Sequence, residues 1–159
     1  MKKILHYLII VYTVLLTISF ISCSNPSSSS NETSKPEWTD VSDKSDLIGT
    51  WKAEFHSDGV HDTNTIYVGS NYAGYLKMEQ DYSEATPDYQ NKIPIVVNYL
   101  RNNGYSCTND SVNKKLTAIL NFSSSDLDLL ITETNMKINS SKTKIKMTSD
   151  GKTAEYSKQ

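Results

Sequence analysis

Hydrophobic and polar residues alternate along several short segments, and this period of two is typical of strands with one buried face. Residues 49–56 show it most clearly. The apolar positions that share one side of this segment are Trp51, Ala53 and Phe55. The Asp58-Gly59 pair that follows predicts a tight hairpin turn, because both central residues of a type I′ turn need positive φ. That turn places Trp51 opposite Ile66, so the predicted hairpin has one continuous apolar face.

The carboxy-terminal residues repeat this arrangement. A second Asp-Gly pair occupies positions 150–151, again between two alternating segments. The register that this turn sets places Met147 opposite Ala154 on an apolar face and Lys146 opposite Glu155 on a polar face. We therefore predict a second hairpin, with an ion pair between Lys146 and Glu155.

A third hairpin is predicted between these two. Apolar residues alternate in 116–122 and again in 127–131, so two strands joined by the loop 123–126 are expected. In this pairing Leu120 faces Leu129 across the hairpin. A shorter strand is expected at 75–78.

One segment has helical spacing instead. Apolar residues in 94–103 recur at intervals of three and four, Pro94 suits a first helical turn, and Gly104 suits the carboxy-terminal cap. The preceding residues, 80–92, are polar and are interpreted as irregular. Together these elements predict an all-β domain at 46–159, in which antiparallel hairpins form a small barrel or a sandwich with one inserted short helix.

The amino terminus has the parts of a secretory signal, with a positive start and an apolar run at 4–20. This run is shorter than the roughly 20 residues that span a bilayer. The residues Phe20-Ile21-Ser22-Cys23 resemble the lipobox of bacterial lipoproteins, with Phe20 where that family usually has Leu. The resemblance implies that residues 1–22 are a cleaved signal peptide and that Cys23 carries lipid chains.

Residues 23–45 are rich in Ser, Asn, Thr, Pro and acidic residues, which predicts a flexible, lipid-anchored tether. Ser24 is not the Asp that implies inner-membrane retention in enterobacterial lipoproteins. The resemblance therefore implies a cell-envelope location, with the outer membrane or the cell surface favoured, and the membrane as a partner through lipidated Cys23. Cys107 then has no disulfide partner and is interpreted as a partly buried small residue.

Residues 47–52, with the pattern Gly49-x-Trp51, resemble the first strand of lipocalins and fatty-acid-binding proteins. The resemblance implies a lipocalin-like barrel whose interior holds a small apolar ligand or is filled by side chains. The arginine that packs on this tryptophan in lipocalins has no counterpart near the carboxy terminus, because Arg101 is the only arginine. The expected interior residues are Trp51, Phe55, Ile66, Leu120, Leu129, Ile131, Ile145 and Met147.

The polar residues indicate little catalytic chemistry. The Asp58-Gly59 turn makes His56 and His61 cross-strand neighbours, which is a weak candidate pair for a metal such as zinc, although exposed histidine pairs are common without one. No nucleophile motif or phosphate-binding loop is present, so we expect a protein without enzymatic activity, catalytic residues or cofactor. A formal net charge of -2 gives no reason to expect a nucleic-acid partner.

Tyrosines are frequent in the middle of the chain. Tyrosine suits half-buried strands, and it also suits binding surfaces, because it offers contact area at a low cost in side-chain entropy. An alternative function is therefore a surface interaction module, either an adhesin or an enzyme inhibitor, that binds a protein partner through residues 67–105.

Overall fold

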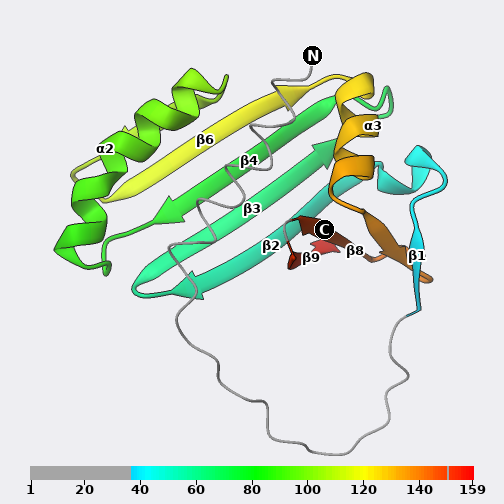
Figure 1. Ribbon diagram of the computed structural model, residues 1–159, viewed down its shortest axis with the longest axis horizontal. Helices are drawn as coiled ribbons and strands as arrows, with labels where there is room; N and C mark the ends of the chain where they lie inside the picture. Colours follow the sequence, from blue (N-terminus) through cyan, green and yellow to red (C-terminus); the bar gives the residue numbers. More distant parts are fainter. Residues whose placement is uncertain (1–36, 150) are drawn as a thin grey trace, which may run out of the picture.

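The computed structural model describes residues 37–149 and 151–159, so the predicted signal peptide, Cys23 and most of the predicted tether lie outside the described residues. In the described part, nine strands form one antiparallel sheet in the order β1-β7-β8-β9-β2-β3-β4-β6-β5 (Figure 1). The strands are β1 (Trp38–Asp40), β2 (Gly49–Ser57), β3 (Val60–Val68), β4 (Gly74–Asp81), β5 (Ser106–Asp110), β6 (Lys115–Phe122), β7 (Lys137–Asn139), β8 (Lys144–Ser149) and β9 (Lys152–Lys158). The helices are α2 (Pro87–Asn102), α3 (Ser124–Glu133) and the short 3-10 helix η1 (Lys44–Leu47).

The prediction of a mostly β, antiparallel domain is confirmed. The described sheet is open, with β1 at one edge and β5 at the other, so the predicted closed barrel is not confirmed. Two α-helices are present where one was expected, and Figure 1 shows both on the same side of the sheet.

The first predicted hairpin is confirmed in its register. Trp51 lies opposite Ile66, as the turn chemistry predicts. Asp58 and Gly59 have φ values of 51° and 77°, which are the positive values that the turn needs. Gly59 is also required by space, because a Cβ atom there would lie 2.2 Å from the carbonyl oxygen of Glu84.

The second predicted hairpin also has the expected register, with Met147 opposite Ala154 and Lys146 opposite Glu155. The predicted ion pair is correct for Glu155 but wrong for Lys146. The Glu155 carboxylate pairs with Lys144 at 2.6 Å, while the Lys146 ammonium lies 4.1 Å from the centre of the Trp38 ring. A cation above an aromatic face is attracted to it, so Lys146 holds β1 against the hairpin.

The third predicted hairpin is wrong, because residues 124–133 form α3 instead of a strand. The cause is local: the Ser123 hydroxyl accepts from the backbone N–H of Asp126, and the Asp126 carboxylate accepts from the backbone N–H of Ser123 at 2.9 Å. This reciprocal capping box favours a helix start. Leu127 and Leu130 then lie on one buried helical side, while Leu129 is 36% exposed. Strand β6 pairs with β4 and β5.

Helix α2 and strand β4 are longer than predicted. The strand expected at 75–78 extends through Asp81, and the helix begins at Pro87 after the cap Thr86, whose hydroxyl accepts from a backbone N–H. The interpretation of 80–92 as irregular is therefore wrong. Gly104 follows the helix end with a φ of +85°, in agreement with its predicted capping role.

The predicted tether ends earlier than residue 45. Trp38–Asp40 form β1, which pairs with β7 almost a hundred residues later in the chain. This pairing depends on contacts far apart in sequence, so the local composition of the segment did not indicate it.

Two apolar clusters cover one face of the sheet, which we call the inner face. Helix α3 contributes Leu127 and Leu130 to the first cluster, where Trp51 is 0% exposed and its indole N–H donates to the Leu47 carbonyl at 2.7 Å. Helix α2 contributes its buried side chains to the second cluster. The opposite face of the sheet, which we call the outer face, carries the alternate and mostly polar positions of the same strands.

Replacing Ser123 by Ala tests the origin of α3. We expect Ser123→Ala to lower the free energy of unfolding by about 0.5–2 kcal/mol, because the cap loses its hydroxyl acceptor. Urea denaturation followed by circular dichroism measures this change. The exposed Ser111→Ala is the control and should leave stability unchanged, whereas equal stability of both variants would contradict the capping argument.

Candidate functional site

Most of the predicted interior residues are brought together, but inside a packed core. Trp51, Ile66, Ile145 and Met147 belong to the first cluster, against which the half-buried Phe55 and Ile131 pack. Leu120 belongs to the second cluster, and Leu129 belongs to neither. The side chains expected to line a cavity thus contact one another and the helices.

The helices explain this filling. The buried residues of α2, namely Ile93, Val97 and Leu100, cluster with inner-face residues of β4 and β6. Leu127 and Leu130 of α3 do the same with β2, β3 and β8. In lipocalin-like barrels the space next to the sheet is open to a ligand, whereas here helical side chains occupy it.

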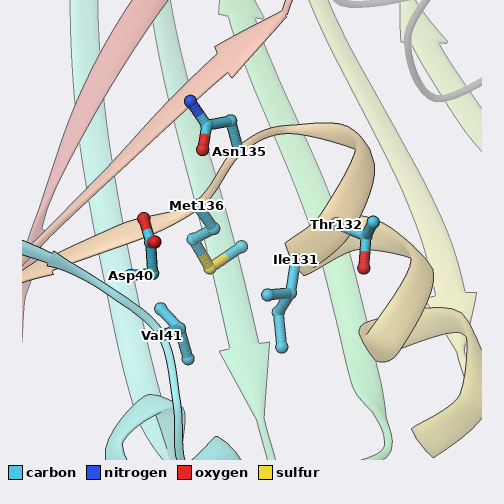
Figure 2. Close-up of a pocket in the computed structure, with 6 residues that line it drawn as sticks. All are labelled: Asp40, Val41, Ile131, Thr132, Asn135 and Met136. Atoms are coloured by element: carbon cyan, nitrogen blue, oxygen red, sulfur yellow. The ribbon is translucent and has the colours of Figure 1, made fainter.

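A shallow hollow lies where the end of α3 meets the segment after β1 (Figure 2). Its volume is about 180 Å³, and it is lined by Asp40, Val41, Ile131, Thr132, Asn135 and Met136. Ligand pockets for drug-sized molecules measure about 300–1,000 Å³. This hollow could therefore accept only a small group, and Ile131 is its only member from the predicted interior set.

His56 and His61 are neighbours, as predicted. They lie opposite each other in the β2–β3 register, with ring centres 4.3 Å apart and the ring planes nearly perpendicular. Both side chains are exposed on the outer face. Within the described residues no group of three or more His, Cys, Asp and Glu side chains could hold a metal ion. The pair therefore lacks a third ligand there.

A polar group interrupts the inner face between the two apolar clusters. Asp62 and Asn64 of β3 and Gln80 of β4 occupy inward positions and belong to neither cluster. We call these three residues the polar seam. The Gln80 side chain is 2% exposed, and its Nε2 donates to Asp62 Oδ1 at 2.8 Å. Its Oε1 is buried and has no hydrogen-bond partner.

Burial dominates the electrostatics of the seam. It raises the pKa of the Asp62 carboxyl, and the Gln80 hydrogen bond and the charges of His56 and His61 offset part of that rise. Burial, and secondarily the Asp62 charge, raise the pKa of Tyr89 to about 12, while a side-chain hydrogen bond with Gln80 offsets part of that rise. Tyr89 is therefore a neutral phenol at physiological pH, and the Asp62 carboxylate lies within its electrostatic range.

The sequence analysis missed this seam, although a signal was present. The predicted register of β3 already placed Asp62 and Asn64 on the same face as Ile66, which is a break in an otherwise apolar pattern. Polar residues at core-facing positions are candidates for a functional role, because a purely structural core avoids them.

The tyrosine-rich stretch does not form one surface. Tyr82 and Tyr105 are buried in the second cluster, and Tyr89 and Tyr99 pack against it. On the outer face, Tyr67 is 39% exposed and stacks on its β4 neighbour Tyr75, with ring centres 5.3 Å apart. Among the described residues of this stretch, Tyr67 is therefore the exposed tyrosine, with the half-buried Tyr75 beside it.

Cys107 is partly buried, as predicted, and is a free thiol on the edge strand β5. Burial raises the pKa of this thiol, which makes it less reactive than an exposed cysteine. The Arg101 guanidinium donates to the carbonyl oxygen of Cys107 at 3.1 Å.

No helix among the described residues is long and apolar enough to cross a membrane. No protein-family model, curated protein or solved structure matches this chain.

Asp62 gives a pH-dependent prediction. Its pKa is higher in the folded protein than in the unfolded chain, so its contribution to stability is present at low pH and is lost as pH rises through the folded pKa. We expect Asp62→Asn to be more stable relative to wild type at pH 7 than at pH 3, as measured by urea denaturation at both values.

Asp110 is the control for this prediction. Hydrogen bonds from Asn113 lower its pKa, so Asp110→Asn should show the opposite dependence and cost more stability at pH 7 than at pH 3. The same pH trend in both variants would contradict the conclusion that burial destabilises the ionised form of Asp62.

Proposed function

We propose that this chain is a lipid-anchored lipoprotein of the bacterial cell envelope, and that its sheet domain is an interaction module that binds a protein partner. The proposal includes no enzymatic activity, catalytic residue or cofactor. Cys23 is its lipidation site, and the outer membrane or the cell surface is its favoured location.

The anchor is supported by the order of segments along the chain. A charged start, an apolar run and the motif ending at Cys23 precede a polar stretch that reaches the domain. A coil of the length of residues 24–36 spans about 20 Å on average. Two or three acyl chains hold a protein stably in a bilayer, whereas a single chain is marginal. The domain would thus stand close to the membrane, with β1 nearest to it.

The filled inner face is the observation that favours an interaction module over a carrier. The predicted cavity residues, such as Trp51 and Ile145, are buried against other side chains. The outer face carries no described helix and presents the stacked Tyr67 and Tyr75 beside the ion pair of Lys77 with Glu79, at 2.8 Å. Aromatic side chains surrounded by charged groups are typical of protein interfaces.

A lipocalin-like carrier of a small apolar ligand is the second candidate. The hollow lined by Val41, Ile131 and Met136 supports it, since these side chains are apolar. Native mass spectrometry of the protein after incubation with a cell lipid extract distinguishes the two candidates. A stoichiometric apolar adduct that is lost on Ile131→Trp would support the carrier, and bare protein would exclude it for those lipids.

Lipidation is tested by metabolic labelling. We expect cells that express the full chain to incorporate labelled palmitate into it, because in lipoproteins the cysteine thiol carries a diacylglyceryl group and the new amino group is usually acylated. Cys23→Ser should abolish the label and leave the protein with an uncleaved signal. Cys107→Ser is the matched control and should label like wild type, and label that persists in Cys23→Ser would contradict the proposal.

The outer face is tested by a photo-crosslinking residue placed in the full chain in intact cells. We expect one adduct of defined mass when it replaces Tyr67, because that side chain is exposed within the aromatic pair. The control position is Ile95 of α2, which is 70% exposed and lies away from the outer face. Equal adducts at both positions, or none at Tyr67, would exclude this face as the binding surface.

A further inference from the structure

The polar seam has an arrangement that a structural core does not need. Phe55, Asp62 and Gln80 are consecutive inward residues across β2, β3 and β4. Phe55 packs against the first apolar cluster, and Leu116, the next residue in this row, belongs to the second. In this row the acidic and amide side chains lie between the two cores, which Leu76 of β4 joins in another row.

Gln80 holds Asp62 in place and keeps one acceptor unused. Its Nε2 donates to Asp62 Oδ1 at 2.8 Å, while its own Oε1 is buried without a donor. A buried polar atom without a partner costs free energy, and native proteins contain few of them. Asp62 is only half-buried, so part of the seam reaches solvent.

We propose that the polar seam is a binding site for a protonated primary amine, which Asp62 holds as its counterion and which also donates to Gln80 Oε1. An ammonium group has three N–H donors and one positive charge. It can therefore satisfy the carboxylate and the unpaired amide oxygen together. Asp62 keeps acceptor capacity beyond its bond with Gln80, because a carboxylate has about four lone-pair sites.

Two aromatic residues flank this position. Phe55 lies directly opposite Asp62 on β2. Tyr89 of α2 lies beside Gln80, whose side-chain hydrogen bond lowers the Tyr89 pKa, and near the Asp62 charge, which raises that pKa. They pack against different apolar clusters, so they approach the seam from two sides. Aromatic faces attract ammonium groups, and the methylene groups of an alkylamine suit such walls.

A metal ion or an anion fits the seam less well. Calcium takes six to eight oxygen ligands and magnesium needs nearly ideal octahedral geometry. The described residues contain no cluster of three or more metal-ligating side chains, and the seam offers one carboxylate. The same carboxylate repels an anion. An organic amine needs only the charge, one further acceptor and apolar walls.

The site is independent of the proposed anchor and of the outer face. An amine could come from a free metabolite or from a lysine side chain of a protein. The shared chemistry is the ammonium group on an alkyl chain, and two probes distinguish the sources: butylammonium chloride for the free amine and Nα-acetyl-lysine amide for the side chain.

The test uses the full-length protein in a neutral detergent, titrated with each probe and followed by two-dimensional NMR. We expect saturable shifts of the Gln80 side-chain amide and of backbone signals at Phe55, Asp62 and Tyr89, with at least one probe. Tighter binding of one probe identifies the source. Sodium butyrate, which has the opposite charge, should not bind.

Three variants decide the result. Asp62→Asn is nearly isosteric and should weaken binding about 10- to 100-fold, which is the loss of one charge-assisted contact. Gln80→Met should weaken it as well, while keeping the volume. Glu54→Gln removes the same charge from the outer face and should bind like wild type. Absence of saturation, or equal affinity in folded Asp62→Asn, overturns the proposal.

Discussion

Each central strand of this sheet carries most of its apolar side chains on one face, and an open sheet cannot bury that face by itself. Two helices inserted between strands supply the missing cover: α2 lies over the half containing β6, and α3 over the half containing Trp51 (Figure 1). The need to cover the apolar face has two consequences for the structure. It produces two apolar clusters in place of one, and it leaves the outer face to polar residues.

The same cover bears on the functions that the pattern of strands allows. A calyx needs an inner face that helices do not fill, and the buried state of Ile145 and Met147 shows that it is filled in their region. What remains available is the outer face, with Tyr67 and Tyr75, and the seam where the two clusters meet. The proposed roles use these two places because the core itself has no room.

The sequence predicted those elements whose cause is local. Asp58-Gly59 and the glycine at 151 act through the backbone of their own turns, so both hairpin registers could be derived from nearby residues. The alternation at 127–131 led to a wrong strand prediction, because a leucine-rich segment fits both the strand period and the helix period. The capping box at Ser123 favours the helix. The pairing of β1 with β7 joins distant segments and leaves no local signal.

The seam shows why a site can be partly visible in a sequence. The inward position of Asp62 follows from the turn at Asp58-Gly59 alone. A polar residue at an apolar position could therefore be recognised from the sequence. Its partner Gln80 belongs to a strand whose length was underestimated, and Tyr89 to a helix turn that was predicted as irregular. A carboxylate becomes informative only when its surroundings are known, because burial and an unpaired amide oxygen beside Asp62 set it apart from a solvated charge.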